Sequence, residues 1–250
     1  MLYQTFMAKA HTRKLAPNLS KLFLLIALSG CELAGASEID ASLVNEAKSQ
    51  VFSDNASTLY CGCPISYSET ASNPDAINLY ACGFEANQVG VNEASLLAWD
   101  YIVPLVYIND RANTQALAGD LHNIVPVENQ IKRFRKDAKH GYVGHPVTLW
   151  GNSCPVRFSG NGIDHEDHDI LEPQDCTKGD IARVWLYAHD KYNLNIDEVY
   201  LNNYRKWNDR DPVSPAEKRR HDRIVKAQGY ANPYVDKASP DPKGSCSWQN

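Results

Sequence analysis

The cysteines constrain the fold of this chain more than any other feature. The 250-residue sequence contains seven cysteines, and all but Cys31 lie downstream of an apolar leader. Disulfides form in exported proteins, so the six downstream cysteines predict three disulfide bonds whose pairing stays open. The Cys61–Cys63 pair has one intervening residue and no matching second pair, which does not suit zinc or redox chemistry. The disulfide candidates are Cys61, Cys63, Cys82, Cys154, Cys176 and Cys246.

The first 36 residues predict a signal peptide. Their basic residues precede the apolar run Leu22–Leu28, which is too short to span a bilayer. Removing the four basic residues and the one acidic residue of this leader changes the formal net charge from −5 to −8. An acidic protein does not bind nucleic acid through its overall charge, because such binding depends on neutralising phosphates. Any nucleic-acid site must therefore be a local basic patch.

Two processing routes of the signal peptide remain open. The sequence Leu28–Cys31 resembles a bacterial lipobox, which would make Cys31 a lipidated first residue and anchor the protein to a membrane. The sequence Ala34–Ala36 instead suits ordinary cleavage directly after it. Both routes predict export to the periplasm or the extracellular space. Because 43% of the residues are hydrophobic and 22% are charged, residues 37–250 are expected to form a single globular domain.

The stretch Trp99–Arg135 is the predicted centre of this domain. The alternating and β-branched residues that begin it predict a strand, and the residues after Pro126 have helical spacing. Asp100 would then face a helix across a polar loop. Such a carboxylate can hold a single hard cation against a phosphate. The basic residues of the helix fit either a phosphate-binding patch or a solvated face, and they are Lys132, Arg133, Arg135, Lys136 and Lys139.

The rest of the chain predicts a largely helical domain. Apolar residues at helical spacing indicate four further helices. The last of them has a clear start, since Ser214–Glu217 is a capping box with proline at the first helical position, and Gly229 supplies its C-cap. Residues 140–176 contain many glycines and predict loops. The four helices are expected over residues 37–50, 179–192, 196–207 and 214–228.

One cluster of possible metal ligands lies within the loop-rich part. The segment Asp164–Asp169 contains His165 and His168 among acidic residues, which are ligand types for transition metals. Two histidines three residues apart in a loop are more often solvated side chains than ligands. The cluster is therefore a secondary candidate for a metal site.

Several short motifs recur in the order found in one known family. The motifs are Tyr60–Cys63, Cys82–Phe84, Trp99–Pro104, Asp120–Ile124 with Pro126, Gly179–Arg183, Tyr192–Leu194, Trp207–Asn208, Asp222–Ile224, Gln228–Gly229 and Asn232–Val235. Together they resemble the bacterial endonuclease I family of secreted nucleases over roughly residues 57–246. The resemblance implies an α+β fold, with a mixed, largely helical domain around a ββα-metal motif and pinned by disulfides. It also implies a monomeric, Mg²⁺-dependent endonuclease that cuts DNA, and often RNA, with little sequence preference.

The resemblance also implies roles for single residues. In the family, a strand histidine acts as general base, and the acid before it and a helix asparagine bind the metal. Here Asp100 keeps the acid, Tyr101 stands at the position of the base and Lys132 at that of the asparagine. A tyrosine is almost wholly protonated at neutral pH, and a protonated lysine cannot ligate Mg²⁺. We therefore predict that catalysis is weakened or lost, and that Lys132 pairs with Asp100 in place of the metal.

Other residues offer substitutes for the missing functions. Asn129 lies one helical turn before the substituted asparagine position and could reach the metal in a shifted register. His122 could replace the base, although the family has a histidine there too, which favours a structural role. The phosphate-binding candidates are Arg133, Arg135 and Arg183, and a structural ion pair explains Arg183 equally well. The alternative function is that of an inactive homologue that binds nucleic acid or another envelope partner.

Overall fold

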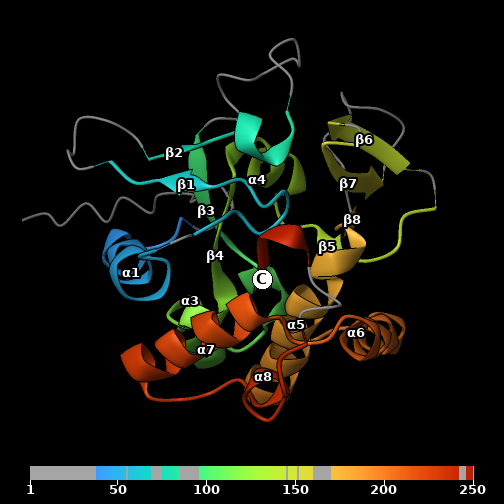
Figure 1. The fold of residues 1–250 in the computed structure, drawn as a ribbon. Helices are drawn as coiled ribbons and strands as arrows, with labels where there is room; N and C mark the ends of the chain where they lie inside the picture. Colours follow the sequence, from blue (N-terminus) through green and yellow to red (C-terminus); the bar gives the residue numbers. More distant parts are fainter. Residues whose placement is uncertain are drawn as a thin grey trace, which may run out of the picture. The chain divides into compact units, whose positions relative to one another are not determined.

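The computed structural model has an antiparallel strand pair, β3 (Leu97–Tyr101) and β4 (Ile124–Glu128), at its centre (Figure 1). All residues of β4 are buried, which explains its nearly continuous apolar sequence. In the register of the pair, Asp100 lies opposite Val125 of the buried strand. The structure describes residues 38–54, 56–68, 75–84, 96–144, 146–150, 152–159, 170–241 and 246–249.

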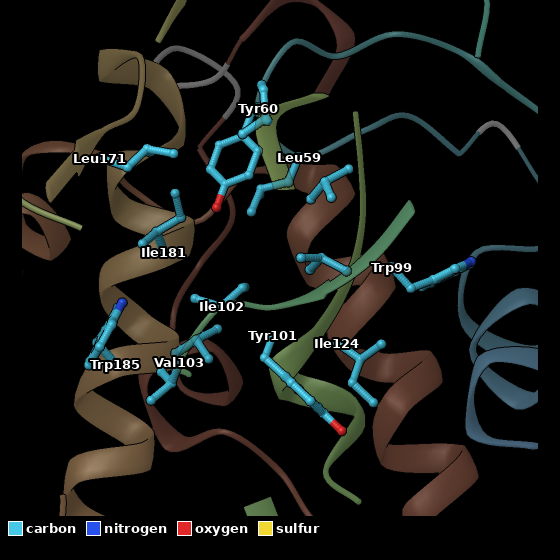
Figure 2. Close-up of a cluster of buried hydrophobic side chains, with 14 of the residues drawn as sticks. Leu59, Tyr60, Trp99, Tyr101, Ile102, Val103, Ile124, Leu171, Ile181 and Trp185 are labelled. Atoms are coloured by element: carbon cyan, nitrogen blue, oxygen red, sulfur yellow. The ribbon is translucent and has the colours of Figure 1, made fainter. Parts of the chain in front are cut away.

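Helix α5 (Lys178–Tyr192) forms the core together with this strand pair. Figure 2 shows Ile181 of α5 and Ile102, the residue that follows β3, within one buried cluster between the helix and the strand. Helix α6 (Glu198–Arg210) packs against α5 on its other side. Burial of such apolar side chains supplies most of the stabilisation of a domain of this size.

The three helices predicted from residue 179 onwards are confirmed, the last of them as α7 (Pro215–Gln228). Ser214 Oγ accepts the backbone N–H of Glu217 at 3.0 Å, and Gly229 takes a left-handed φ of 84°. The carboxylate of Glu217 is directed elsewhere, because both of its oxygens accept hydrogen bonds from Arg183. Half of the predicted capping box is therefore replaced by a tertiary ion pair.

The N-terminal helix is shorter than the prediction over residues 37–50. Helix α1 spans Ala41–Glu46 and continues as a π-helical turn, η1, over Ala47–Val51. Asp40 caps α1, because its side chain accepts the backbone N–H of Ser42 at 2.8 Å. The capping by Asp40 thus explains why the helix begins at Ala41 and not at residue 37.

Residues 140–176, which the sequence predicts as loops, hold most of a four-stranded sheet in the order β5-β8-β7-β6. The pairing of β5 with β8 is parallel, and β7 is antiparallel to both β6 and β8. The prediction of loops is wrong here, because strands this short give no clear period in a glycine-rich sequence. The cluster Asp164–Asp169 lies outside the described residues. The strands are β5 (Lys139–His140), β6 (Pro146–Trp150), β7 (Cys154–Ser159) and β8 (Ile170–Glu172).

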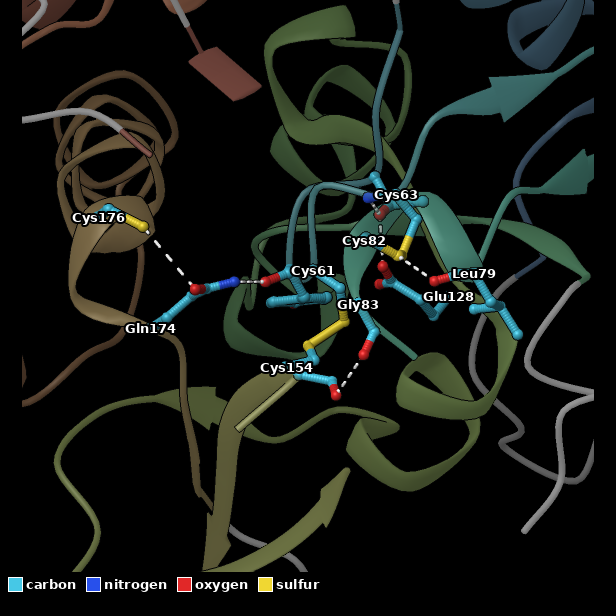
Figure 3. Close-up of a disulfide and its surroundings, with 12 residues drawn as sticks. Cys61, Cys63, Leu79, Cys82, Gly83, Glu128, Cys154, Gln174 and Cys176 are labelled. Carbon is cyan, nitrogen blue, oxygen red and sulfur yellow. Dashed lines mark hydrogen bonds between the residues drawn. A yellow bond between two sulfur atoms is a disulfide. The ribbon is translucent and has the colours of Figure 1, made fainter. Parts of the chain in front are cut away.

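Three disulfides join parts of the chain that are distant in sequence, and Figure 3 shows two of them. Cys61–Cys154 spans 93 residues, Cys63–Cys82 spans 19 and Cys176–Cys246 spans 70. In the chain-entropy model, a bond that closes a loop of roughly 90 residues stabilises the fold by about 4–5 kcal/mol. The predictions of three disulfides and of an α+β fold are confirmed.

The other described elements are short. Within the described ranges, no helix combines the length and the apolar character that a membrane crossing requires. These elements are β1 (Ile65–Ser66), β2 (Ala76–Ile77), η2 (Tyr80–Cys82), η3 (Leu105–Tyr107), α3 (Arg111–Ala118), η4 (Leu121–Asn123), α4 (Asn129–Arg135), η5 (Asp175–Thr177), α8 (Pro233–Asp236) and η7 (Ser247–Gln249).

Candidate functional site

Asp100 lies at the end of β3, and protein donors engage both of its carboxylate oxygens. Oδ2 accepts a hydrogen bond from Arg135 Nη1 at 2.6 Å, and Oδ1 accepts the backbone N–H of Tyr101 at 3.0 Å. The guanidinium of Arg135 also donates to the backbone carbonyls of Tyr101 at 2.6 Å and Ile102 at 2.7 Å. The Arg135 side chain is fully buried, and the Asp100 side chain is 10% exposed. The strand carboxylate is thus neutralised by an internal cation in a charge-assisted hydrogen bond.

The prediction that Lys132 pairs with Asp100 is wrong, because Arg135 is the cation that pairs with this carboxylate. Lys132 Nζ donates instead to the backbone carbonyl of Trp99 at 2.7 Å. Helix positions three residues apart lie on the same face, and α4 runs along β3. Arg135 lies one helical turn after Lys132 and therefore reaches the carboxylate of Asp100. Lys132 reaches only the backbone carbonyl of Trp99, the preceding strand residue.

The residues around Asp100 do not fit a divalent metal ion. Asn129, the substitute ligand, donates its backbone N–H to the carbonyl of Leu96, four residues before Asp100. At about 3.3 Å per strand residue, this contact lies about 13 Å from Asp100. The groups that do reach the carboxylate region, Arg135 and Lys132, are cations without a lone pair for a metal. Among the described residues, no group of three or more His, Cys, Asp or Glu side chains could hold a metal.

Tyr101 occupies the predicted position of the base, but its hydroxyl is directed away from Asp100. The hydroxyl donates to the backbone carbonyl of Ala118 at 3.2 Å. Burial, with a smaller contribution from the carboxylate of Asp40, raises the pKa of Tyr101 above its usual value. The phenol therefore stays protonated at neutral pH. The cavity that it lines together with Asp100 and Lys132 measures only about 20 Å³, which is enough for one water molecule.

His122, the substitute base, lies in a different part of the core. Its ring stacks on His221 with centroids 5.4 Å apart, and its Nε2 lies 3.3 Å from the backbone carbonyl of Tyr230. A carbonyl can only accept, so Nε2 carries the proton of the neutral ring. Burial is the main reason that the pKa of His122 falls to about 4. The structure does not bring this neutral imidazole to Asp100.

Asp120, which begins the motif Asp120–Ile124 but was given no role of its own from the sequence, is a buried acceptor for several side chains. The hydroxyls of Tyr187 and Tyr192 both donate to its Oδ2. Its Oδ1 accepts from Gln228 Nε2 at 2.9 Å and from the backbone N–H of His122 at 2.9 Å. Burial acts to raise the pKa of Asp120, but these hydrogen bonds outweigh it and lower the pKa. The motif around Asp120 and His122 therefore holds η4 against α5 and α7.

Two of the three phosphate-binding candidates are buried. Arg183 donates to Glu217 through Nε at 2.7 Å and Nη2 at 2.6 Å, and through Nη1 to the backbone carbonyl of Asp211 at 2.7 Å. Its side chain is 1% exposed, so Arg183 forms a structural ion pair and is not accessible to a phosphate. Arg135 is equally enclosed by its contacts to β3. Arg133, on α4, is exposed.

A second set of buried polar groups lies behind the Asp100–Arg135 pair. His140 Nδ1 accepts from Trp185 Nε1 at 3.0 Å, and His140 Nε2 lies 2.9 Å from the hydroxyl of Tyr60. Because Nδ1 accepts, Nε2 carries the proton and donates to Tyr60. Burial, followed by the charge of Arg135, lowers the pKa of His140 well below its usual value. The ring therefore stays neutral, and no spacing in the sequence predicted that His140 joins Trp185 and Tyr60.

Two strands followed by a helix, with a strand carboxylate against a basic helix, define a disulfide-linked α+β protein of the ββα type. Residues 37–239 match the family model described as Endonuclease I, and the chain belongs to this family. The resemblance found in the sequence is thereby confirmed.

Three relatives show the range of similarity. Endonuclease-1 of Buchnera aphidicola subsp. Acyrthosiphon pisum is 28% identical over 195 residues, covering 72% of this chain and 74% of that protein. The periplasmic deoxyribonuclease of Aeromonas hydrophila is 24% identical over 203 residues, covering 75% of this chain and 81% of that protein. The extracellular ribonuclease of Bacillus amyloliquefaciens is 28% identical over 152 residues, covering 52% of this chain and 49% of that protein.

Proposed function

We propose that this protein is an exported, nucleic-acid-binding member of the endonuclease I family whose ββα site no longer performs metal-dependent hydrolysis. The observation that carries the proposal is the buried ion pair between Asp100 and Arg135. Relatives named as deoxyribonucleases and ribonucleases support nucleic acid as the ligand. Function resides in the site rather than in the fold, so the substituted site counts against the family's chemistry.

The proposed loss of hydrolysis follows from the protonation and pairing of the site residues. Phosphodiester hydrolysis needs a group that takes a proton from water, and a means of neutralising the charge that develops on the phosphate. Tyr101 keeps its proton and donates to a carbonyl. Asp100 cannot accept a metal without displacing Arg135, which would leave a buried guanidinium without its counter-ion.

The outer side of α4 is the proposed surface for nucleic acid. Arg133 and Lys136 are exposed there, and Lys132 is partly exposed. Lysine and arginine attract phosphate without any metal, so binding can outlast catalysis. Because the net charge of the whole chain is −5, the attraction is local, and we expect weak binding that falls steeply with salt.

The decisive test is nicking of supercoiled plasmid by the purified protein with Mg²⁺, Mn²⁺ or EDTA. We expect no metal-dependent nicking, and a gel shift of the same DNA that weakens as salt increases. Replacing Arg133 by Gln should weaken the gel shift. It should also reduce the slope of the logarithm of the binding constant against the logarithm of the salt concentration by about one. Metal-dependent nicking that Asp100→Asn abolishes would refute the loss of catalysis.

A second candidate is a hydrolase that retains the family activity at low efficiency. It is favoured by the retained carboxylate of Asp100 and by the intact frame of β3, β4 and α4. Calorimetric titration with Mn²⁺ distinguishes the two candidates. Tight binding that is lost in Asp100→Ala would support the hydrolase, and no binding would support the inactive homologue.

Export is part of the proposal, although residues 1–36 and Cys31 lie outside the described residues. Relatives named as extracellular and periplasmic support a secreted protein. We propose cleavage of the leader either before Cys31, with lipidation, or after Ala36. Mass spectrometry of the mature N-terminus distinguishes these routes, since only the first adds a lipid to Cys31. Gel filtration tests the expected monomer.

A further inference from the structure

A cavity of about 450 Å³ lies between α7, η1 and the C-terminal turn η7. Three arginines of α7 line it, namely Arg219, Arg220 and Arg223, together with the ring of Trp248. We call it the arginine cavity. Its volume is in the range of sites for small ligands. It shares no lining residue with the small cavity beside Asp100, so it is a separate feature of the fold.

The arginines of this cavity differ in how they are paired. Arg223 is held by Asp54 at 2.8 Å and by the backbone carbonyl of Val51 at 3.1 Å. Arg220 lies 3.7 Å from Asp180, a long contact for an ion pair. Arg219 is exposed, and its charge acts on the carboxylate of Asp54 without forming an ion pair with it. The guanidinium groups of Arg219 and Arg220 are therefore held less closely than that of Arg223.

Two of the three acidic residues of the wall are engaged by the core, and the third, Asp54, pairs with Arg223. Asp180 and Glu217 both accept hydrogen bonds from the buried Arg183. Burial, followed by the neighbouring carboxylate of Glu217, raises the pKa of Asp180 well above its usual value. Four guanidinium groups at and behind the wall, those of Arg183, Arg219, Arg220 and Arg223, stand against three carboxyl groups, those of Asp54, Asp180 and Glu217. Positive charge therefore exceeds negative charge at the cavity.

Trp248 supplies a fixed aromatic wall. A Cβ built on Gly62 would lie 2.1 Å from Cδ2 and 2.2 Å from Cε2 of the indole. These two atoms form the bond shared by the two rings, which can be approached this closely only from a face. Gly62 therefore covers one face of the indole. The Cys176–Cys246 disulfide and the hydrogen bond from Gln249 Nε2 to Asp180 Oδ2, at 3.0 Å, hold the turn in place.

We propose that the arginine cavity binds a nucleoside phosphate, with the phosphate on Arg219 and Arg220 and the base stacked on the face of Trp248 that Gly62 does not cover. Guanidinium groups bind phosphate in a bidentate, charge-assisted manner. Stacking on an aromatic ring accepts any base. The ligand is either a free nucleotide or the phosphorylated end of an oligonucleotide, which share this chemistry.

Calorimetric titration of the full mature protein with 5′-AMP tests the proposal, with inorganic phosphate and a 5′-phosphorylated trinucleotide as parallel probes. We expect saturable one-to-one binding of AMP. Arg219→Gln should weaken it about tenfold, as expected for one charge-assisted hydrogen bond. Trp248→Leu should weaken AMP binding and leave phosphate binding unchanged. Tighter binding of the trinucleotide than of AMP would support a chain end as the ligand.

The matched control is Arg205→Gln, an exposed arginine on α6 that is remote from the cavity lining. It should leave the affinity for AMP unchanged, and the thermal unfolding of each variant shows that it is folded. Absence of saturable binding by AMP and the trinucleotide would overturn the proposal, as would full affinity in Arg219→Gln. Phosphate binding as tight as AMP binding would overturn the role of Trp248. Because no residue is shared with α4, these results do not depend on the plasmid assays.

Discussion

Glu128, at the end of β4, offers the sharpest test of the physical reasoning. Its side chain is fully buried, and its Oε1 accepts a hydrogen bond from the hydroxyl of Thr58. That hydroxyl in turn accepts the backbone N–H of Cys63 at 2.9 Å. Burial is the largest influence on the carboxyl and raises the pKa of Glu128 to about 7 from its ordinary 4.5. The folded protein therefore holds this proton more tightly than the unfolded chain does.

The expected effect on stability follows from the two pKa values of Glu128. The difference between about 7 and 4.5 corresponds to about 3 kcal/mol. Because the folded pKa is the higher one, this stabilisation is fully present below about pH 4.5 and is lost as the pH rises through about 7. Glu128→Gln keeps an acceptor for Thr58 and cannot ionise. The wild-type protein should therefore lose about 3 kcal/mol relative to this variant between pH 4.5 and pH 8.

Urea denaturation with intact disulfides, followed by tryptophan fluorescence, measures this difference across the pH range. Subtracting the two curves removes the titration of groups that both proteins share. Glu198→Gln is the control, because the Glu198 side chain is 67% exposed and its neutralisation should leave the pH dependence nearly unchanged. The reasoning is refuted if the free energy of unfolding of Glu128→Gln runs parallel to that of the wild type between pH 4.5 and pH 8. The buried carboxyl would then not ionise in this pH range.

Three further substitutions test burial and packing. Arg135→Met should lower the free energy of unfolding by about 3–5 kcal/mol, since it leaves the buried carboxylate of Asp100 without a partner. Arg205→Ala should cost less than about 1 kcal/mol, because that ion pair is exposed on α6. Gly62→Ala should cost about 1–3 kcal/mol, since its Cβ would lie 2.1 Å from the indole of Trp248 at a φ of +70°. Urea denaturation at pH 7 measures all three.

Two comparisons decide these predictions. If Arg135→Met and Arg205→Ala destabilise the protein equally, burial is not what makes the pair with Asp100 important. Adding Asp100→Asn to Arg135→Met should recover part of the lost stability, because the unpaired charge is then removed. A Gly62→Ala variant as stable as the wild type would show that the C-terminal turn can move away without cost. The emission lost on Trp248→Leu, compared between the Gly62→Ala and wild-type backgrounds, then separates Trp248 from the other four tryptophans and reports whether its environment has changed.

Local patterns in the sequence determined several parts of the structure. The start of α7 follows from Ser214 and its end from Gly229, because capping depends on residues within one turn of the helix. The use of six cysteines in three disulfides was predicted from their number together with the expectation of export. The order of the short motifs was sufficient to indicate the family. In each case, the information lies in neighbouring residues or in their order along the chain.

The tertiary structure alone decided which partner each buried polar group has. Arg135 and Lys132 are both cations on one face of α4, and only the position of the helix against β3 sends Arg135 to Asp100. The disulfide pairing and the small sheet likewise depend on contacts between segments tens of residues apart. Hydrogen bonds and ion pairs form over a few ångströms in space, whatever the distance along the chain. The sequence therefore established which charged groups exist, and the packing of helix against strand determined that Asp100 is paired with a guanidinium.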